Sequence, residues 1–188
     1  EIVIANGVEC EPVLAKDKAI MRGRPGDVAY GLAAMMGCVG APRGVIAIKR
    51  KNSREVDAMK AAARAYADMS VAEVGDYYPA GDEHVLVYEL TGRVVPAGGI
   101  PLQVGAVVSN VETLLNVGNA VRDGAPVTHK YVTVAGEVKR PGTFRAPVGT
   151  SLAQLIEAAG GVRESPGRCF EVLVDGPMMG KTLPPGQD

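Results

Sequence analysis

The sequence has few of the features by which proteins bind nucleic acid or cross a membrane. It contains no tryptophan and only two phenylalanines, whereas proteins that hold single-stranded nucleic acid stack the bases on aromatic side chains. Its formal net charge of -1 provides no general basic surface, and the local cluster of Arg50, Lys51 and Arg54 is interpreted as a solvated loop. No apolar run approaches the roughly 20 residues that a membrane-spanning helix needs. The sequence therefore predicts neither a nucleic-acid partner nor a membrane span.

The chain also lacks the local motifs of metal, disulfide and nucleotide-phosphate chemistry. Its cysteines, Cys10, Cys38 and Cys169, are far apart, and neither His84 nor His129 belongs to a zinc-binding motif. It has no Gly-x-x-x-x-Gly-Lys-Ser/Thr loop and no Gly-x-Gly-x-x-Gly fingerprint. We therefore expect no metal site within the chain. No spacing identifies a nucleophile–base pair, so no catalytic residue is predicted. Cysteines that form no framework favour a reducing, cytoplasmic setting.

Glycine and proline are abundant, with 24 and 13 residues, and they separate hydrophobic segments. Up to residue 126, short apolar runs alternate with amphipathic ones. This pattern predicts an α/β domain with a mainly parallel, Rossmann-like sheet. The expected strands are 2–5, 44–48, 71–74 and 107–108. The expected helices are 16–22, 27 to 37 or 40, 53–66, 81–90 and 110–121, with Ser53 and Asn110 as caps and Val121 facing inward.

The pattern changes after Pro126. Residues 131–138 alternate in the manner of a strand, Lys-Arg-Pro-Gly at 139–142 makes a turn, and 143–148 form the returning strand. Ser151, with Gln154 as its capping-box partner, opens a short helix that the glycines at 160 and 161 end. A last strand is expected at 171–174. Hairpin, helix and strand predict a small α+β module of the β-grasp type, which divides the chain into domains at 1–126 and 127–188.

Three polar segments stand where a ligand could bind. The first, Asn-Gly-Val-Glu-Cys-Glu-Pro at 6–12, follows the first expected strand, and in open α/β sheets ligands bind at the carboxyl ends of strands. Asn6, Glu9 and Glu11 could hydrogen-bond a ribityl chain, a ribose or a nicotinamide amide. Glu9 and Glu11 would point to one side of an extended chain. Taken alone, the same residues are also compatible with a solvated acidic turn.

The second and third segments each mark the start of a helix. Tyr-Pro-Ala-Gly-Asp-Glu at 78–83 contains Gly81, which permits close backbone approach. Asp82 and Glu83 in this segment either line a pocket or simply stabilise the helix N-terminus. Asn110, in Ser-Asn-Val-Glu-Thr at 109–113, either caps its helix or holds a phosphate together with the neighbouring backbone N–H groups.

In this order, the three segments resemble one protein family. Residues 5–17 are similar to the Asn-x-Asp-Glu-x-Glu-Pro…Lys-Asp stretch of the flavin-binding 51 kDa subunit of respiratory NADH dehydrogenase, with Val8 where that subunit has Asp. Residues 78–83 resemble its Tyr-x-x-Gly-Glu-Glu, and residues 109–114 resemble its Asn-Asn-x-Glu-Thr-Leu. Residues 131–161 are similar to the soluble-ligand-binding β-grasp (SLBB) domain that follows in the same family. The resemblance covers nearly the whole chain.

The resemblance implies a site for FMN and NADH. The implied cofactor-binding residues are Asn6, Glu9 and Glu11 near the flavin ring and nicotinamide, Gly81, Asp82 and Glu83 lining the flavin or nucleotide pocket, and Asn110 at the ribityl-phosphate end. The family's Gly-rich loop lies before the first strand and its iron–sulfur cysteine clusters lie after the β-grasp domain. The chain is therefore expected to be the core of a longer protein with 4Fe–4S clusters elsewhere, inactive alone and binding flavin weakly or not at all.

Two branches of the superfamily fit the motifs. One is the cobalamin reductase of propanediol-utilisation microcompartments, which Asp82-Glu83 and Pro-Val-Thr at 126–128 favour. It implies electron transfer to a corrinoid, in the cytoplasm or the microcompartment lumen, with a corrinoid adenosyltransferase or a shell protein as a further partner. The other is the C subunit of the Rnf complex, which implies exchange between NADH and ferredoxin at the cytoplasmic face of a membrane complex. A third interpretation is a non-catalytic module that binds a ligand or a partner.

Overall fold

The computed structural model describes residues 1–163 and 171–183, and these residues form two compact units. The first unit contains Glu1–Cys10 and Asp17–Val127. The second contains Glu11–Lys16 and the described residues from Thr128 onward. The short segment Glu11–Lys16 thus belongs with residues that follow it by more than a hundred positions. Cys169 lies outside the described residues.

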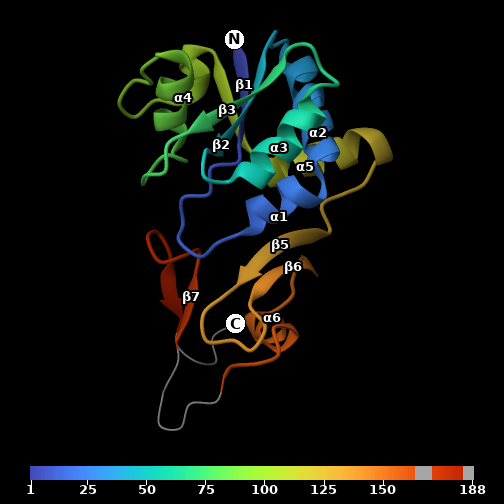
Figure 1. Cartoon of the computed structure of the whole chain (residues 1–188), viewed down its shortest axis with the longest axis vertical. Coiled ribbons are helices and arrows are strands. Elements are labelled where there is room, and N and C mark those ends of the chain that lie inside the picture. The colour runs from blue at the N-terminus through green and yellow to red at the C-terminus, as the bar shows by residue number, and fades with distance from the viewer. Residues whose placement is uncertain (164–170, 184–188) are drawn as a thin grey trace. The chain divides into compact units, whose positions relative to one another are not determined.

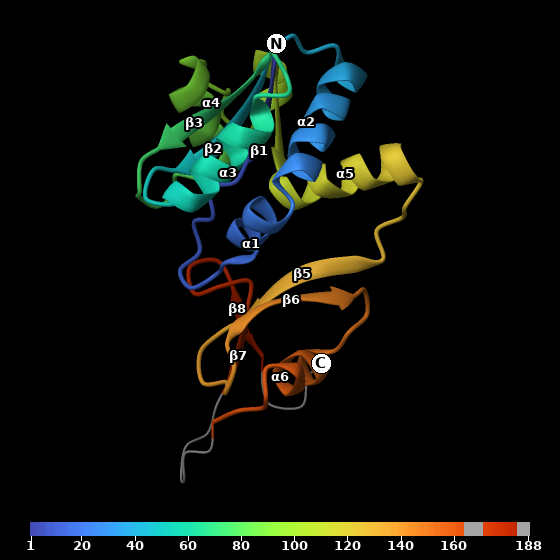
Figure 2. The same ribbon diagram turned by 45° about the vertical axis from the view of Figure 1, so that its right-hand side comes forward.

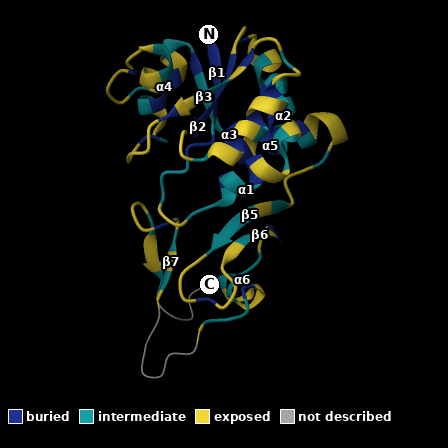
Figure 3. Cartoon of the chain, in the orientation of Figure 1, coloured by how far each residue is buried: buried dark blue, intermediate teal, exposed yellow. Residues whose placement is uncertain are grey.

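A four-stranded parallel sheet forms the centre of the first unit (Figure 1). Its strands are β1 (Ile2–Asn6), β2 (Gly44–Lys49), β3 (Met69–Val74) and β4 (Ala106–Asn110), in the order β3-β2-β1-β4. β1 and β2 are buried almost throughout, as the dark ribbon in Figure 3 shows, because central strands of a parallel sheet are covered on both faces. The predicted parallel α/β sheet is confirmed.

Helices cover both faces of this sheet. They are α1 (Lys16–Gly23), α2 (Pro25–Val39), α3 (Ser53–Ala63), α4 (Glu83–Thr91) and α5 (Val111–Asp123), with a 3-10 turn at Pro101–Val104. Figures 1 and 2 show α2, α3 and α5 on one face and α4 on the other. On the α4 side, Ile2, Ile4, Val45, Ala47 and Leu86 belong to one apolar cluster. In the part of the chain that the structure describes, no helix has the length and apolar character needed to cross a membrane.

The strand order places a topological switch point beside β1. The chain moves outward from β1 to β2 and β3, and then returns to β4 on the opposite side of β1. In open α/β sheets, ligands bind outside the carboxyl ends of the strands at such a point. The last residues of β1 and β4, Asn6 and Asn110, are direct partners in the ladder. The fold therefore brings two of the predicted site residues side by side.

The second unit is built from two antiparallel hairpins and a short helix. β5 (His129–Val134) pairs with β6 (Gly142–Pro147), α6 (Leu152–Ala158) follows, and β7 (Val172–Val174) pairs with β8 (Lys181–Leu183). Ser151 and Gln154 form the predicted capping box in front of α6, with bonds of 2.9 and 3.2 Å. The order of hairpin, helix and strand agrees with the α+β module expected from the sequence.

The second unit differs from the sequence-based expectation in its first hairpin and in one additional strand. The first expected strand there ends at Val134 instead of Val138, since Gly136 takes a φ of +90° that a continuing strand cannot accommodate. Val138 instead makes a single antiparallel bridge to Val162, and the connection between β5 and β6 is longer than a four-residue turn. The strand β8 was not expected, because Lys-Thr-Leu is too short to show an alternating pattern.

Three helix details in the first unit also differ. α3 is preceded by Asn52, and Ser53 is already its first helical residue, because the Asn52 carbonyl accepts the first helical bond from Val56. The helix ends at Ala63 instead of Tyr66. Val121 is 58% exposed and does not face inward. Gly118, one turn earlier, still packs against α2, whereas residues 120–123 at the end of α5 are all exposed.

Candidate functional site

Asn6 ends β1, and its side chain joins two of the three predicted segments. Its Oδ1 accepts a hydrogen bond from the Val8 N–H at 3.0 Å, which turns the chain directly after the strand. Its Nδ2 donates to the carbonyl of Gly81 at 2.9 Å, 75 positions later in the chain. An amide nitrogen carries two hydrogens, so Nδ2 keeps a second donor after this bond.

Gly81 is where the segment after β1 and the segment before α4 touch. Its N–H donates to the Sγ of Cys10, while its carbonyl accepts from Asn6. A Cβ at this position would collide with the Val8 carbonyl oxygen and the Cys10 sulfur. Val8 itself is 3% exposed and belongs to the apolar cluster under α4. A carboxylate at position 8 would be buried in that cluster, so the apolar residue suits this chain.

Asp82 and Glu83 follow at the start of α4. The Oδ1 atom of Asp82 accepts from the N–H groups of His84 at 2.9 Å and Val85 at 3.2 Å, so Asp82 is the N-cap of the helix. Glu83 is the first helical residue, and its side chain is half exposed. The helix-stabilising interpretation therefore accounts for the Asp82 carboxylate, whereas the Glu83 carboxylate faces solvent beside the imidazole of His84.

Asn110 caps α5, as predicted. Its Oδ1 accepts from the Glu112 N–H at 2.9 Å, and its Nδ2 donates to the Oδ2 of Asp17 at 2.9 Å. Asp17 and Glu112 are both 3% exposed. Asn110 thus links the end of β4, the first turn of α5 and a buried carboxylate of α1.

Glu9 and Glu11 fall in different units, Glu9 in the first and Glu11 in the second. The Oε2 atom of Glu11 accepts from the Met178 N–H at 2.9 Å. Its carboxylate also occupies the space that a side chain at Gly176 would need. Within the second unit, Glu11 therefore holds the loop between β7 and β8.

Comparison with known families gives the assignment of this fold. Residues 1–119 match the Nuo51 FMN-binding domain, and residues 131–182 match the SLBB domain. The chain belongs to the Nuo51 FMN-binding domain family. The resemblance inferred from its three polar segments is thereby confirmed, as is the SLBB region after them.

Named relatives of this Nuo51-family chain come from both expected branches. It is 39% identical over 181 residues to the cobalamin reductase PduS of Salmonella typhimurium, covering 96% of this chain and 39% of that protein. It is 33% identical over 183 residues to a component of the Na(+)-translocating ferredoxin:NAD(+) oxidoreductase complex of Acetobacterium woodii, covering 97% of this chain and 41% of that protein. The chain therefore spans about two fifths of the length of these relatives.

A solved structure supports the same fold. The NAD+-reducing [NiFe]-hydrogenase in the air-oxidized state contains a chain that matches 98% of this one, with a TM-score of 0.81 and 26% identity. The match covers 36% of the hydrogenase chain. The Rossmann-like sheet and the small antiparallel region thus recur together in a redox enzyme.

Lys49 and Asp76, which the sequence did not single out, lie at the same edge of this Nuo51-family sheet, together with Lys51 of the predicted solvated loop. Lys49 ends β2, its side chain is 8% exposed, and its Nζ lies 3.1 Å from the Oδ1 of Asp76. Lys51 Nζ lies 2.6 Å from the other oxygen of Asp76. Hydrogen bonds from Lys51 and Lys49 hold the pKa of Asp76 below its ordinary value. The only signal in the sequence is a lysine that ends an apolar run, since the partnership with Asp76 depends on the fold.

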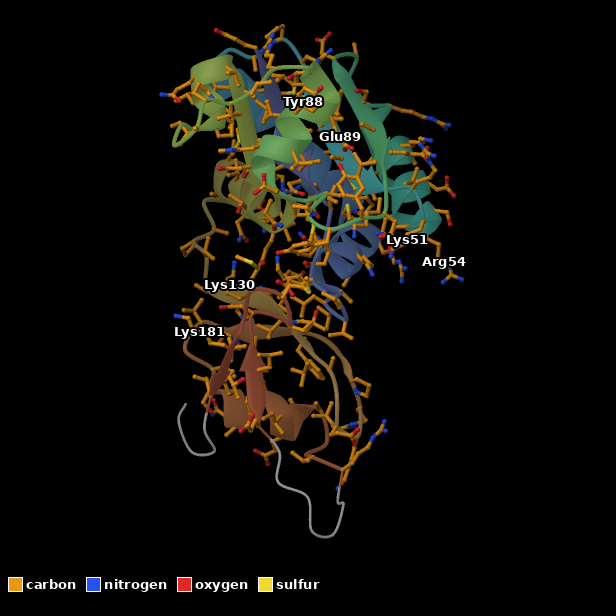
Figure 4. All side chains as sticks on the ribbon, turned by 90° about the vertical axis from the view of Figure 1, so that its left-hand side faces the viewer. Lys51, Arg54, Tyr88, Glu89, Lys130 and Lys181 are labelled. Atoms are coloured by element: carbon orange, nitrogen blue, oxygen red, sulfur yellow. The ribbon has the colours of Figure 1, made fainter. Side chains whose placement is uncertain are left out.

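Tyr77, the residue after Asp76, is also held by a side-chain contact. Its hydroxyl donates to the Oε1 of Glu89 on α4 at 2.5 Å (Glu89 is labelled in Figure 4). This hydrogen bond, with a smaller effect of partial burial, raises the pKa of Tyr77 to about 12. The phenol therefore stays protonated at any ordinary pH and serves as a fixed donor.

The described residues do not indicate a metal site, and their pocket lies away from the candidate site. Among residues 1–163 and 171–183, no group of three or more His, Cys, Asp or Glu side chains could hold a metal ion. A shallow pocket of about 500 Å³ lies at the amino ends of β2 and β3, lined by residues such as Met36, Tyr66 and Met69. It is at the end of the sheet opposite to Asn6 and Asn110, so it does not belong to the candidate site.

Proposed function

We propose that this chain is the core of a protein that takes electrons from NADH through FMN and passes them to iron–sulfur clusters outside these residues. The observation that carries the proposal is the pair of asparagines at the switch point. Asn6 and Asn110 end adjacent parallel strands and are partners in the ladder. Their position is the one at which open α/β sheets bind nucleotide-like cofactors.

The groups at this edge suit the polar parts of FMN. The remaining Nδ2 hydrogen of Asn6 can donate to a carbonyl or hydroxyl oxygen. The N-terminus of α5, a helix of 13 residues, offers the positive end of its dipole beside Asn110, which suits a phosphate. Gly81 keeps the backbone close to the chain after β1, so the wall formed there has a main-chain surface without a projecting side chain.

FMN, when bound, would accept a hydride from NADH and release the two electrons one at a time, which is the chemistry that the protein itself cannot supply. The role of this chain would be to bind FMN and NADH and to orient them toward each other. Asn6, Glu9 and Asn110 would contact the flavin, and Glu83, exposed at the start of α4, would accept hydrogen bonds from the ribose or amide of the nicotinamide nucleotide. Asp82 and Gly81 would keep that helix start in place.

A corrinoid is the acceptor that we favour. Identity to the cobalamin reductase of Salmonella typhimurium, at 39%, exceeds the 33% to the ferredoxin-linked protein of Acetobacterium woodii. A cobalamin reductase would work in the cytoplasm or in a microcompartment lumen, beside a corrinoid adenosyltransferase or a shell protein. The alternative is an Rnf-type subunit that exchanges electrons between NADH and ferredoxin at the cytoplasmic face of a membrane complex.

One observation favours a rival from another class. The side-chain oxygens of Asn6 and Asn110 both accept bonds from the protein itself, and so does the Asp82 carboxylate. These residues would be needed for folding even if no cofactor were bound. The rival is a module without catalysis, in which the SLBB unit recognises a corrinoid, a partner subunit or a shell protein.

Reduction of a dye by NADH in the full-length protein tests the proposal. We expect activity with a flavin absorbance spectrum, and faster NADH oxidation when a corrinoid is added than when ferredoxin is added. Replacement Asn110→Ser keeps an oxygen for the helix cap but removes the amide, and Glu83→Gln removes the charge at the helix start. Both are expected to lower activity, whereas Asp57→Asn, exposed on α3, should not.

Several results would count against it. Unchanged dye reduction in Glu83→Gln and Asn110→Ser would show that the site residues are assigned wrongly. A full-length protein with neither flavin nor NADH oxidation would support the non-catalytic module. The 188-residue chain alone is expected to bind flavin weakly or not at all, so a yellow preparation of this chain would contradict the expectation.

A further inference from the structure

Lys49 is a buried cation at the carboxyl end of β2. The strand register shows on which face of the sheet the Lys49 side chain lies. Asn6 is the ladder partner of Ala47, and Lys49 lies two residues further on, so its side chain leaves the sheet on the same face as Asn6. Val74, the ladder partner of Lys49, belongs with Ala47 to the apolar cluster of this face. Lys49 therefore extends from the apolar layer beneath the candidate site.

A buried ammonium at this point is not explained by stability. Taking an ammonium out of water is energetically costly, and an apolar residue of similar volume usually serves the fold at least as well. The partner of Lys49 is a half-exposed carboxylate, Asp76, which also binds the half-exposed Lys51. An exposed lysine alone could neutralise the charge of Asp76, so the second, buried lysine calls for another role.

The contacts of residues 76–83 indicate what that role is. Asp76 begins this segment and is held by Lys49, and Tyr77 is held by Glu89. Towards the other end of the segment, the carbonyl of Gly81 accepts from Asn6. Asp82 and Glu83 complete the segment. The link from Lys49 to Asp76 thus fixes the start of a segment whose other end forms part of the candidate site.

We infer that Lys49 is a positioning residue of the site, acting through Asp76 on the segment 76–83. The consequence for cofactor binding rests on the proposed function, whereas the effect on the segment does not. Lys51 is the matched control, because it binds the same carboxylate from the exposed side of the β2–α3 connection (Figure 4). Loss of Lys51 removes one positive charge beside Asp76 but leaves the buried contact between Lys49 and Asp76 in place.

Amide hydrogen exchange of the ligand-free chain tests the link. Lys49→Met is expected to speed exchange at Gly81 and its neighbours by about tenfold with little change in the midpoint of thermal unfolding, while Lys51→Met leaves exchange at the wild-type rate. Asp76→Asn, at a half-exposed position, keeps the fold even if Lys49→Met does not, and should speed exchange several-fold. Equal exchange in wild type, Lys49→Met and Asp76→Asn would overturn the inference, as would equal acceleration by Lys51→Met.

Quenching of FMN fluorescence by the full-length protein separates this inference from the proposed function. If the wild type binds FMN, Lys49→Met should weaken binding by roughly tenfold or more, because the segment 76–83 is displaced. Wild-type affinity in Lys49→Met would remove the positioning role and leave the proposed function standing. If the wild type binds no FMN, the proposed function fails, and the exchange rates alone decide the role of Lys49.

Discussion

At the scale of single residues, the candidate site depends on a position that has no side chain. Gly81 accepts from Asn6, donates to Cys10 and leaves no space for a Cβ. The atoms that a Cβ would meet include the carbonyl oxygen of Val8, which is main chain and cannot rotate away. The approach of the two segments therefore depends on glycine as much as on the polar residues beside it.

Replacement Gly81→Ala should destabilise the first unit by about 1–3 kcal/mol, because an added methyl group in a fully occupied space forces the backbone apart. Urea unfolding followed by circular dichroism measures this. Gly37→Ala is the matched control. Gly37 lies in α2 with nothing within 4 Å of a Cβ, so alanine should stabilise the chain by about 0.5–1 kcal/mol. Equal effects of the two replacements would mean that position 81 is not crowded.

At the scale of elements, the sequence was informative wherever a signal was local. Apolar runs located β1 and β2, and the caps at Asn110 and Ser151 were recognised from residue type and spacing. The end of α3 was missed because Ala65 and Tyr66 bond to carbonyls three residues back, a local change that the apolar spacing does not show. The exposure of Val121 was missed because it depends on neighbours in space. For the same reason the sequence could not reveal the bonds that join Asn6 to Gly81 or Lys49 to Asp76, since these pairs are brought together by the sheet.

The packing of α2 against α5 carries an ion-pair network that makes stability depend on pH. Asp27, at the start of α2, binds Arg24 and also Arg122 of α5, the latter at 2.7 Å. The hydrogen bond from Arg24, and then that from Arg122, hold the pKa of Asp27 below its ordinary value of 3.8, against the opposing effect of partial burial. The folded state thus binds this proton less readily than the unfolded state.

It follows that the contribution of Asp27 to stability is present above the unfolded pKa of 3.8 and is lost as the pH falls through the lower folded value. Asp27→Asn should therefore cost about 0.5–1 kcal/mol at neutral pH, a modest amount because both arginines are 42% exposed. The difference from wild type should shrink as the pH falls below 3.8. Urea unfolding at a series of pH values measures it, and a difference that grows in acid would contradict the assignment.

At the scale of the whole molecule, the chain is not cut into its units at one point. The second unit includes Glu11–Lys16, which the chain supplies before most of the first unit. Ala15 donates its N–H to the hydroxyl of Thr133 at 3.0 Å, and Glu11 accepts from Met178. Residues 127–188, expected from the sequence to form a domain, therefore have additional partners near the N-terminus. A piece that begins at residue 127 would lack them.

Glu11 can be tested for the two roles that it has been given. If it serves as an acceptor for the Met178 N–H, Glu11→Gln keeps a carbonyl oxygen there and should leave the β7–β8 loop almost unchanged. Glu11→Ala should instead lower the local stability of that loop by about 1–2 kcal/mol, because the charged acceptor of the Met178 N–H is lost. Hydrogen exchange at Met178 and Gly180 measures this, with Glu157→Ala on the exposed surface of α6 as the control.

If Glu11 acts as a carboxylate beside the nicotinamide, Glu11→Gln would weaken NADH oxidation by the full-length protein without altering exchange. The charge-neutral replacement therefore distinguishes a structural acceptor from a cofactor contact.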